Sequence, residues 1–207
     1  MTSLAAPSDP MDSADVRSLG GRLRALRTAR GISARTLAKS LGISASAVSQ
    51  IERGVMQPSV SRLIAITDAL GVPLADVFDD AGDSDERHAA SGDEHAGYTL
   101  VRAHQATPVA LESGVTFRRL SPRSTSELDL FESVYPPGST ATGDNALFRH
   151  EGYEIGSVVS GELTIEFDDE TVVLAPGDSI SYPCSKPHRI RNSSSRPAVA
   201  TWLIVHP

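Results

Sequence analysis

The fold of the N-terminal part is decided by residues 35–54, which read RTLAKSLGISASAVSQIERG. Leu37 and Leu41 stand four positions apart, and Val48 and Ile51 stand three apart after an intervening glycine. Apolar residues at intervals of three and four positions define one face of an α-helix, and glycine is a common helix stop. The stretch therefore predicts two short helices joined by a tight turn.

The same pattern extends in both directions, so that residues 16–78 predict about five short helices. Serine is a preferred N-cap residue, and three serines stand directly before predicted helices: Ser33, Ser44 and Ser59. Gly31 follows an apolar run as a helix stop, and Pro73 suits a first helical position. This part of the chain is predicted to be all-α.

The pattern changes after residue 97 to nine or ten short segments rich in β-branched and aromatic residues. They begin with YTLVRA at 98–103 and end with AVATWLIV at 198–205, with turn-forming residues between them. Many short strands without a helix predict a sandwich or a barrel. The predicted organisation is a disordered tail at residues 1–15, a helical domain at 16–78, an acidic linker at 79–97 and an all-β domain at 98–207.

Charge is distributed unevenly along the 207 residues, whose formal net charge is −7. Positions 16–67 hold nine Lys or Arg residues and one acidic residue, Glu52, whereas positions 79–97 hold seven acidic residues and one arginine. A basic block on an acidic chain is typical of a domain that meets a polyanion. The helical domain is therefore the expected nucleic-acid binder.

Several classes of protein are excluded by composition. No run reaches the roughly 18 apolar residues of a membrane-spanning helix, and the start lacks a signal-peptide pattern, so we expect a cytoplasmic protein without a membrane partner. The single cysteine, Cys184, excludes an internal disulfide framework. It is either a redox-sensing thiol or, as we favour, an unreactive packing residue.

The second helix of the opening stretch has an unusual outer face. With 100° per residue, Val48, Ile51 and Ala45 fall on one side of the helix, while Ser46, Ser49, Gln50 and Arg53 fall on the other. This outer face is polar and is uncharged except at its end. Serine, glutamine and arginine are residue types that hydrogen-bond base edges in the major groove. The helix is therefore predicted to read DNA rather than to serve solubility.

Residues 35–54, followed by PSVSRLIAITDALGVPLADVF, resemble the XRE family, the Cro/C1-type helix-turn-helix proteins, through the pattern Ala38, Gly42, Ile51 to Gly54 and Pro58-Ser59. The resemblance implies a lambda-repressor-like five-helix domain whose second motif helix enters the groove. The implied DNA contacts are Ser33, Arg35, Ser44, Ala45, Ser46, Ser49, Gln50 and Arg53. Ala34 departs from the family, which often has glutamine there. The alternative to a DNA-binding domain is a small helical bundle whose arginines form a solvated face.

The segments FRHEGYEIGSVVSGEL at 148–163 and PGDSISYPCSKPHRIRN at 176–192 resemble the two cupin motifs, which implies a jelly-roll barrel. In an extended strand His150 and Glu154 would point to the same side. The expected ligand-binding residues are Phe148, His150, Glu154, Tyr182, His188 and Trp202, with Phe131 and Arg118 as further candidates.

Metal-binding cupins use an H-x-H pair, a glutamate and a later histidine. Phe148 replaces the first histidine here, so His150, Glu154 and His188 form a possible three-ligand site for a divalent metal such as Fe(II), Zn or Ni. The alternative is that these groups hydrogen-bond each other or an organic ligand. No cofactor is otherwise expected.

Together the motifs are similar to the XRE-cupin class of regulators. The expected function is a sequence-specific transcriptional regulator, in the commoner case a repressor, that acts as a homodimer on a double-stranded operator and responds to a small-molecule effector in the barrel. It is not expected to be an enzyme. The alternatives are a metal-dependent cupin dioxygenase or isomerase fused to a DNA-binding domain, and a helix-turn-helix antitoxin or scaffold whose barrel is closed.

Overall fold

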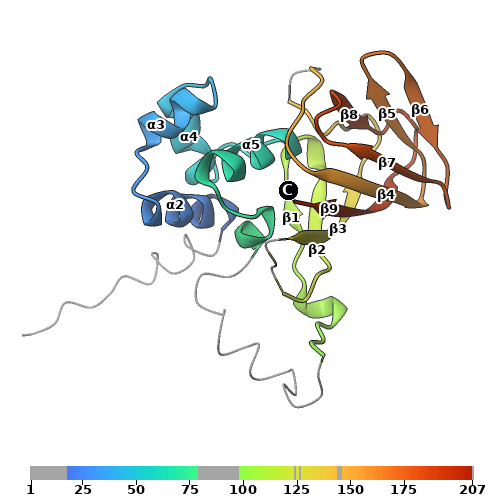
Figure 1. Cartoon of the computed structure of the whole chain (residues 1–207), viewed down its shortest axis with the longest axis horizontal. Helices are drawn as coiled ribbons and strands as arrows, with labels where there is room; N and C mark the ends of the chain where they lie inside the picture. The colour runs from blue at the N-terminus through green and yellow to red at the C-terminus, as the bar shows by residue number, and fades with distance from the viewer. Residues whose placement is uncertain (1–17, 79–97, 124, 126, 144–145, 207) are drawn as a thin grey trace, which may run out of the picture.

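A computed structural model describes residues 18–78 and 98–206, except 124, 126, 144 and 145. Helices fill one side of the molecule and strands the other (Figure 1). We call residues 18–78 the helical part and residues 98–206 the β part. The predicted tail and acidic linker lie outside the described residues, so the domain boundaries stay predictions. None of the described helices is long and apolar enough to cross a membrane.

The helical part contains four α-helices and one 3-10 helix: α2 (Leu19–Ala29), α3 (Ala34–Ser40), α4 (Ala45–Glu52), α5 (Val60–Leu70) and η1 (Leu74–Phe78). The prediction of an all-α region is confirmed, but the last predicted helix is a 3-10 helix of five residues. Five residues make little more than one turn of an α-helix, and short connectors of this length are often 3-10 helices.

The three predicted N-caps are confirmed, because each serine hydroxyl accepts a hydrogen bond from a backbone amide in the first helical turn. Ser33 Oγ accepts from Thr36 N at 3.0 Å, and Ser44 Oγ accepts from Ala47 N at 3.0 Å. Ser59 caps α5 in the same way. Local polar chemistry therefore sets where α3, α4 and α5 begin.

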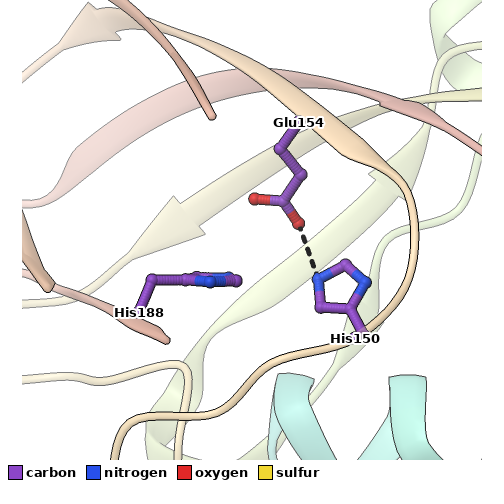
Figure 2. Close-up of side chains that lie close together, drawn as sticks. All are labelled: His150, Glu154 and His188. Carbon is purple, nitrogen blue, oxygen red and sulfur yellow. Dashed lines mark ion pairs between the residues drawn. The ribbon is translucent and has the colours of Figure 1, made fainter. Parts of the chain in front are cut away.

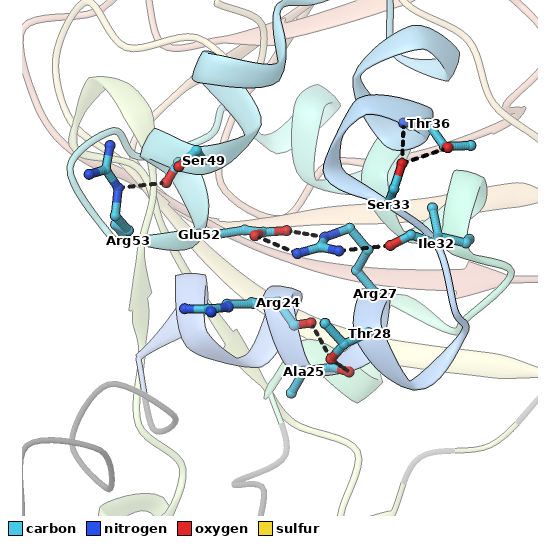
Figure 3. Close-up of polar contacts among 10 residues, drawn as sticks. All are labelled: Arg24, Ala25, Arg27, Thr28, Ile32, Ser33, Thr36, Ser49, Glu52 and Arg53. Carbon is cyan, nitrogen blue, oxygen red and sulfur yellow. Dashed lines mark hydrogen bonds and ion pairs between the residues drawn. The ribbon is translucent and has the colours of Figure 1, made fainter. Parts of the chain in front are cut away.

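A buried ion pair holds α4 against α2. Arg27 Nη2 donates to Glu52 Oε2 at 2.9 Å and Arg27 Nε donates to Oε1, while Nη1 donates to the carbonyl oxygen of Ile32 at 2.7 Å (Figure 3). Gly20 makes this approach possible, because a Cβ there would lie 2.4 Å from the Ile51 carbonyl oxygen. The C-terminal end of α4 is thus fixed by packing and by charge.

The β part forms two antiparallel sheets. The larger has the order β1-β2-β3-β9-β4-β7 and the smaller the order β6-β5-β8. The strands are β1 (Val109–Ala110), β2 (Thr116–Arg119), β3 (Leu128–Tyr135), β4 (Tyr153–Ser160), β5 (Leu163–Phe167), β6 (Thr171–Leu174), β7 (Ser179–Pro183), β8 (His188–Arg191) and β9 (Ala198–Val205). Rings from the two sheets meet in the interior, where the centroids of Tyr182 and His188 are 4.8 Å apart. We call this pair of sheets the barrel.

One predicted strand is wrong. Residues 98–102 have no regular structure, and Ala103–Gln105 forms a 3-10 helix. Tyr98 and Leu100 are exposed. A segment with β-forming residues becomes a strand only where a neighbouring strand and a buried face receive it, and this segment has neither.

The helical part packs against one end of the barrel and shares a core with it. The Phe78 ring lies 5.1 Å from that of Phe131 on β3, and the backbone amide of Ala75 donates to Asp129 Oδ2 at 3.3 Å. Helix α5 lies at this junction in Figure 1. The two parts are therefore in direct contact as well as connected in sequence.

A histidine–aspartate pair at this junction predicts a pH-dependent stability. Asp129 is fully buried, and His206 Nε2 contacts its Oδ2 at 3.0 Å; this hydrogen bond raises the pKa of His206. A raised pKa means that the pair stabilises the fold fully below about pH 6.5 and that this contribution is lost as the pH rises through the folded pKa. We expect the melting temperature of the wild type to exceed that of H206Q most at pH 6, and the gap to narrow by pH 8.5. A constant gap would contradict the prediction.

Candidate functional site

The outer face of α4 is open to solvent. Ala45, Ser46 and Arg53 are exposed, and Ser49 and Gln50 are half-buried at the edge of the same face. The placement of Ala45 on the inner side with Val48 and Ile51 is therefore wrong, because the first helical position lies beyond the packed part of α4. Arg53 Nε donates to the Ser49 carbonyl oxygen at 3.2 Å, which draws the guanidinium back along the helix (Figure 3). Ser33 and Arg35 are exposed at the start of α3, and Ser44 is exposed at the start of α4. The helical part thus presents all eight predicted DNA contacts away from its own core.

Some of the basic residues counted at positions 16–67 bind other groups of the helical part. Three arginines do so: Arg27 binds Glu52, Arg30 binds the carbonyl oxygens of Leu70 and Gly71, and Arg62 binds that of Leu41. Arg30 is nonetheless exposed, as are four further basic residues of the helical part: Arg24, Arg35, Lys39 and Arg53. The cluster of basic residues in the sequence therefore contains both arginines that hold the helices together and basic side chains that are exposed.

A second site lies inside the barrel, where three polar side chains from distant positions meet (Figure 2). His150 precedes β4, Glu154 lies on β4, and His188 begins β8. One ligand atom from each lies within 4.8 Å of the other two. His150 is not part of a strand, so strand alternation does not explain its direction. The chain turns at Gly152, whose φ of +102° suits glycine, before the strand begins.

Both imidazole rings are held through their Nδ1 atoms. His150 Nδ1 lies 3.0 Å from the Glu151 carbonyl oxygen, and His188 Nδ1 lies 2.8 Å from that of Lys186. A carbonyl oxygen only accepts, so each Nδ1 carries a proton and the neutral ring has its lone pair on Nε2. Nε2 of His188 is buried without a hydrogen-bond partner among the described residues. This arrangement is typical of histidine ligands that are oriented by a second contact.

The surroundings of Glu154 favour its ionised form, because they lower the pKa of its carboxyl group. Burial alone would raise its pKa, but the hydrogen bond and charge of His150, the charge of His188 and the Tyr182 hydroxyl together lower it. Tyr182 Oη donates to Glu154 Oε2 at 2.6 Å, and burial raises the pKa of this hydroxyl, so it stays a donor. His150 Nε2 lies 3.3 Å from Oε1, and this contact is a hydrogen-bonded ion pair only when the His150 ring carries a second proton on Nε2. Burial lowers the pKa of His188, which favours its neutral form.

These donors fit a divalent cation. One anionic oxygen and two imidazole nitrogens face one another in a buried site, which is the donor set that Fe(II), Zn and Ni accept. Phe148 lies beside both histidines: its ring centroid is 4.6 Å from that of His188 and 5.5 Å from that of His150. The aromatic ring closes one side of the cluster and makes it apolar.

The remaining predicted pocket residues separate into two groups. Tyr182 and Phe148 contact the cluster. Trp202 is on the inner face of β9, but its indole Nε1 donates to Ser133 Oγ at 2.9 Å and its ring packs over Gly156. Phe131 packs against Phe78, and Arg118 pairs with Glu132 at 2.7 Å. These last three side chains are therefore held by other contacts.

Tyr135 is a candidate that sequence reasoning missed. It is fully buried on the inner face of β3, and its hydroxyl has no hydrogen-bond partner among the described residues. Burial raises the pKa of the Tyr135 hydroxyl, and the negative charge of Glu154 raises it further, so this hydroxyl stays protonated. Its alternation with Phe131 and Ser133 along β3 was the available signal, since residues two apart share a face.

The favoured interpretation of Cys184 gives a second prediction. Its side chain is buried, and burial raises the pKa of its thiol to about 12. Because the thiolate is the reactive form, we expect a disulfide reagent at pH 8 to modify the native protein at least about 100-fold more slowly than the unfolded protein. Equal rates in the two states would support a redox-sensing thiol instead.

Known proteins share both parts of the chain. Residues 23–77 match the helix-turn-helix family, and residues 131–204 match the cupin domain family. The HTH-type transcriptional regulator PuuR of Escherichia coli is 26% identical over 182 residues, which cover 85% of this chain and 88% of PuuR. The transcriptional regulator ClgR of Mycobacterium tuberculosis is 34% identical over 98 residues, which cover 47% of this chain and 77% of ClgR.

The fold also matches a solved structure over nearly its full length. The crystal structure of an HTH_3 family transcriptional regulator from Vibrio cholerae covers 95% of this chain and 99% of its own, with a TM-score of 0.65 and 19% identity. At that identity the likeness concerns the fold. It extends across both the helical part and the barrel.

Proposed function

This chain belongs to the XRE-type helix-turn-helix transcriptional regulators that carry a C-terminal cupin domain, and we propose that a small molecule bound in its barrel controls its affinity for DNA. The observation that carries the proposal is the buried, incompletely paired polar cluster. Among the residues that the structure describes, none is a hydrogen-bond partner of His188 Nε2 or Tyr135 Oη. A buried polar group without a partner costs about 1–3 kcal/mol, which a ligand that supplies the partner would recover.

The DNA-binding role is assigned to the outer face of α4. Ser46, Ser49 and Gln50 would face base edges, while Ser33, Arg35 and Arg53 would face phosphates. A single small domain contacts few base pairs, so we propose a homodimer whose two α4 helices occupy half-sites about 34 Å, or a multiple of it, apart. Repression is the proposed outcome, because a dimer on an operator blocks access to it without any further contact.

Gln50 offers a direct test of base reading. If its amide is bidentate to adenine, Gln50→Ala should weaken operator binding by about 1–3 kcal/mol and relax specificity at one base pair. The measurement is fluorescence anisotropy on operator and random DNA, with Gln57→Ala as the matched control because Gln57 is exposed beyond the end of α4. Equal losses on operator and random DNA would remove Gln50 from the reading face.

The barrel site is proposed to hold a divalent cation through His150, Glu154 and His188. A bound cation would supply Lewis-acid attraction for an oxygen or nitrogen of the effector. The protein itself would contribute the Tyr182 hydroxyl that orients Glu154, the Tyr135 hydroxyl as a further polar contact, and the apolar wall of Phe148. These groups favour a small molecule with a polar head and an apolar body.

The proposed function is tested by native mass spectrometry and metal analysis of the full chain purified without chelator, followed by DNA titration before and after the bound species is removed. Genome-wide recovery of bound fragments supplies the operator. We expect a bound species in the barrel and a change of about 5–150-fold in operator affinity on its removal. An empty barrel, or an affinity that does not respond, would overturn the proposal.

A metal-dependent cupin enzyme is the second candidate, favoured by one observation: two histidines and one carboxylate form a set of only three protein ligands, fewer than a divalent ion coordinates. Such sets also occur in non-haem iron oxygenases. Turnover of a substrate with oxygen consumption by the metal-loaded protein would favour this candidate. Stoichiometric ligand binding without turnover would favour the regulator.

A further inference from the structure

A pocket of about 220 Å³ lies between the helical part and the barrel. One wall is a face of α5, formed by Ser61, Arg62, Ile64, Ala65 and Asp68. The opposite wall is the strip of residues 146–150. Phe148 and His150 belong to both this pocket and the cluster in the barrel. The strip thus separates the proposed effector site from the DNA-binding part by a single layer of chain.

The strip is bound firmly to the barrel side. Phe148 N donates to the His188 carbonyl oxygen at 3.0 Å, and His188 N donates to that of Phe148 at 2.9 Å. His150 N donates to the Cys184 carbonyl oxygen at 3.1 Å. A backbone shift at His188 or Cys184 is therefore passed to the strip through these hydrogen bonds.

Helix α5 is in turn bound to the helix-turn-helix motif. Arg62, which lines the pocket, donates from Nη1 to the Leu41 carbonyl oxygen at 3.0 Å. Leu41 is the C-cap of α3, and it directly precedes the turn that leads into α4. The Arg62 guanidinium therefore spans from the pocket to the carbonyl that ends the first helix of the DNA-binding motif.

A second set of hydrogen bonds joins α5 to the same barrel strand. Ser61 N, in the first turn of α5, donates to the Ala141 carbonyl oxygen at 3.0 Å. Ala141 N donates to the Ile190 carbonyl oxygen at 2.8 Å, and Ile190 lies two residues after His188 on β8. The start of α5 and the strand that carries His188 are thus connected through one buried residue.

We infer that the pocket between α5 and residues 146–150 transmits the state of the barrel to the helix-turn-helix turn, with Arg62 as the positioning residue. This inference deepens the proposed function and rests on it. A shift of the strip changes the space around the Arg62 side chain, which alters its bond to Leu41 and hence the placement of α4 relative to α3. Coupling of this kind needs two states that differ in these contacts.

The first test perturbs the pocket without any ligand. Ala146 both lines the pocket and is exposed, so Ala146→Trp places a large ring at the pocket; Ala175→Trp is the matched control because Ala175 is exposed on another loop of the barrel. Hydrogen–deuterium exchange of the full chain is read at residues 41–46. We expect Ala146→Trp to raise exchange there at least about fivefold and Ala175→Trp to leave it unchanged. No change with Ala146→Trp would overturn the inference.

A double-variant comparison isolates Arg62. In an Arg62→Gln background, Ala146→Trp should produce no further change at residues 41–46, because the link to Leu41 is already lost. Arg62→Lys serves as the second variant if thermal unfolding shows that Arg62→Gln is not folded. An equal response with and without the arginine would show that the signal takes another route and would overturn the role of Arg62.

The final test uses Co²⁺ alone as the barrel probe, with its absorption spectrum reporting binding at the histidines. Binding of Co²⁺ should alter exchange at residues 58–68 and 41–46 in the wild type. In Arg62→Gln the change at 41–46 should be lost, while the change at 58–68 persists through the bond from Ser61 N to the Ala141 carbonyl oxygen. Co²⁺ binding without any change in the helical part would overturn the inference. If Co²⁺ does not bind, the proposed cation site fails, and the Ala146→Trp experiments alone decide the inference.

Discussion

Glu52→Ala is expected to lower the free energy of unfolding by about 3–5 kcal/mol, the usual cost of leaving one member of a buried ion pair alone. The side chains of Arg27 and Glu52 are 11% and 8% exposed, so water does not replace the lost partner. The measurement is urea unfolding followed by circular dichroism at 222 nm. Operator binding should fall as well, since Glu52 is the last residue of α4.

Two controls separate the ion pair from general effects of substitution. Glu162 is exposed on a turn of the barrel, and Glu162→Ala should change stability by no more than about 0.5 kcal/mol. The double variant Arg27→Met/Glu52→Leu should recover most of the loss, because an apolar pair of similar volume removes both buried charges. A cost below about 1 kcal/mol for Glu52→Ala would show that the pair does not hold α4.

Elements that depend on local chemistry were predictable from the sequence. Helix starts at Ser33, Ser44 and Ser59 need only a hydroxyl that accepts from the following turn, and strands such as β3 and β9 follow from alternation in the sequence itself. The segment at 98–103 has the same β-rich composition but lacks a partner strand. Whether a partner is present depends on distant residues, which single-sequence patterns do not reveal.

The barrel cluster was only partly predictable, because some of its residues belong to a sequence motif and others are brought together by distant strand pairing. The spacing of His150, Glu154 and His188 made them candidates, whereas Tyr135 carries no motif and becomes visible only when β3 lies next to β9. Arg62 was counted as one charge in a basic block. Its bond to Leu41 joins positions 21 residues apart, and its exposure to the pocket depends on how the helical part packs on the barrel.

Removal of one barrel ligand should have the second large effect. His188→Asn is expected to lower the affinity for Co²⁺ or Zn²⁺ at least about 100-fold, because changing even an outer contact of a metal ligand costs about 10–100-fold. Calorimetric titration with the metal measures this, and His104→Asn is the control because His104 is exposed outside the barrel. An unchanged affinity would mean that metal binds elsewhere and that the cluster recognises an organic ligand directly.

The complementary variant adds a ligand where the sequence has an aromatic ring. Phe148 stacks on His150 with a centroid distance of 5.5 Å and lies 4.6 Å from His188, so a histidine at this position would direct its ring toward the same centre. Phe148→His should therefore raise the affinity for Zn²⁺ at least about tenfold, since four ligands complete the coordination that zinc prefers. A gain in this variant together with the loss in His188→Asn can arise only if both side chains face one cation, because unspecific surface binding would respond to neither. No gain in Phe148→His would indicate that the three-residue cluster is shaped for the polar group of an effector rather than for a metal ion.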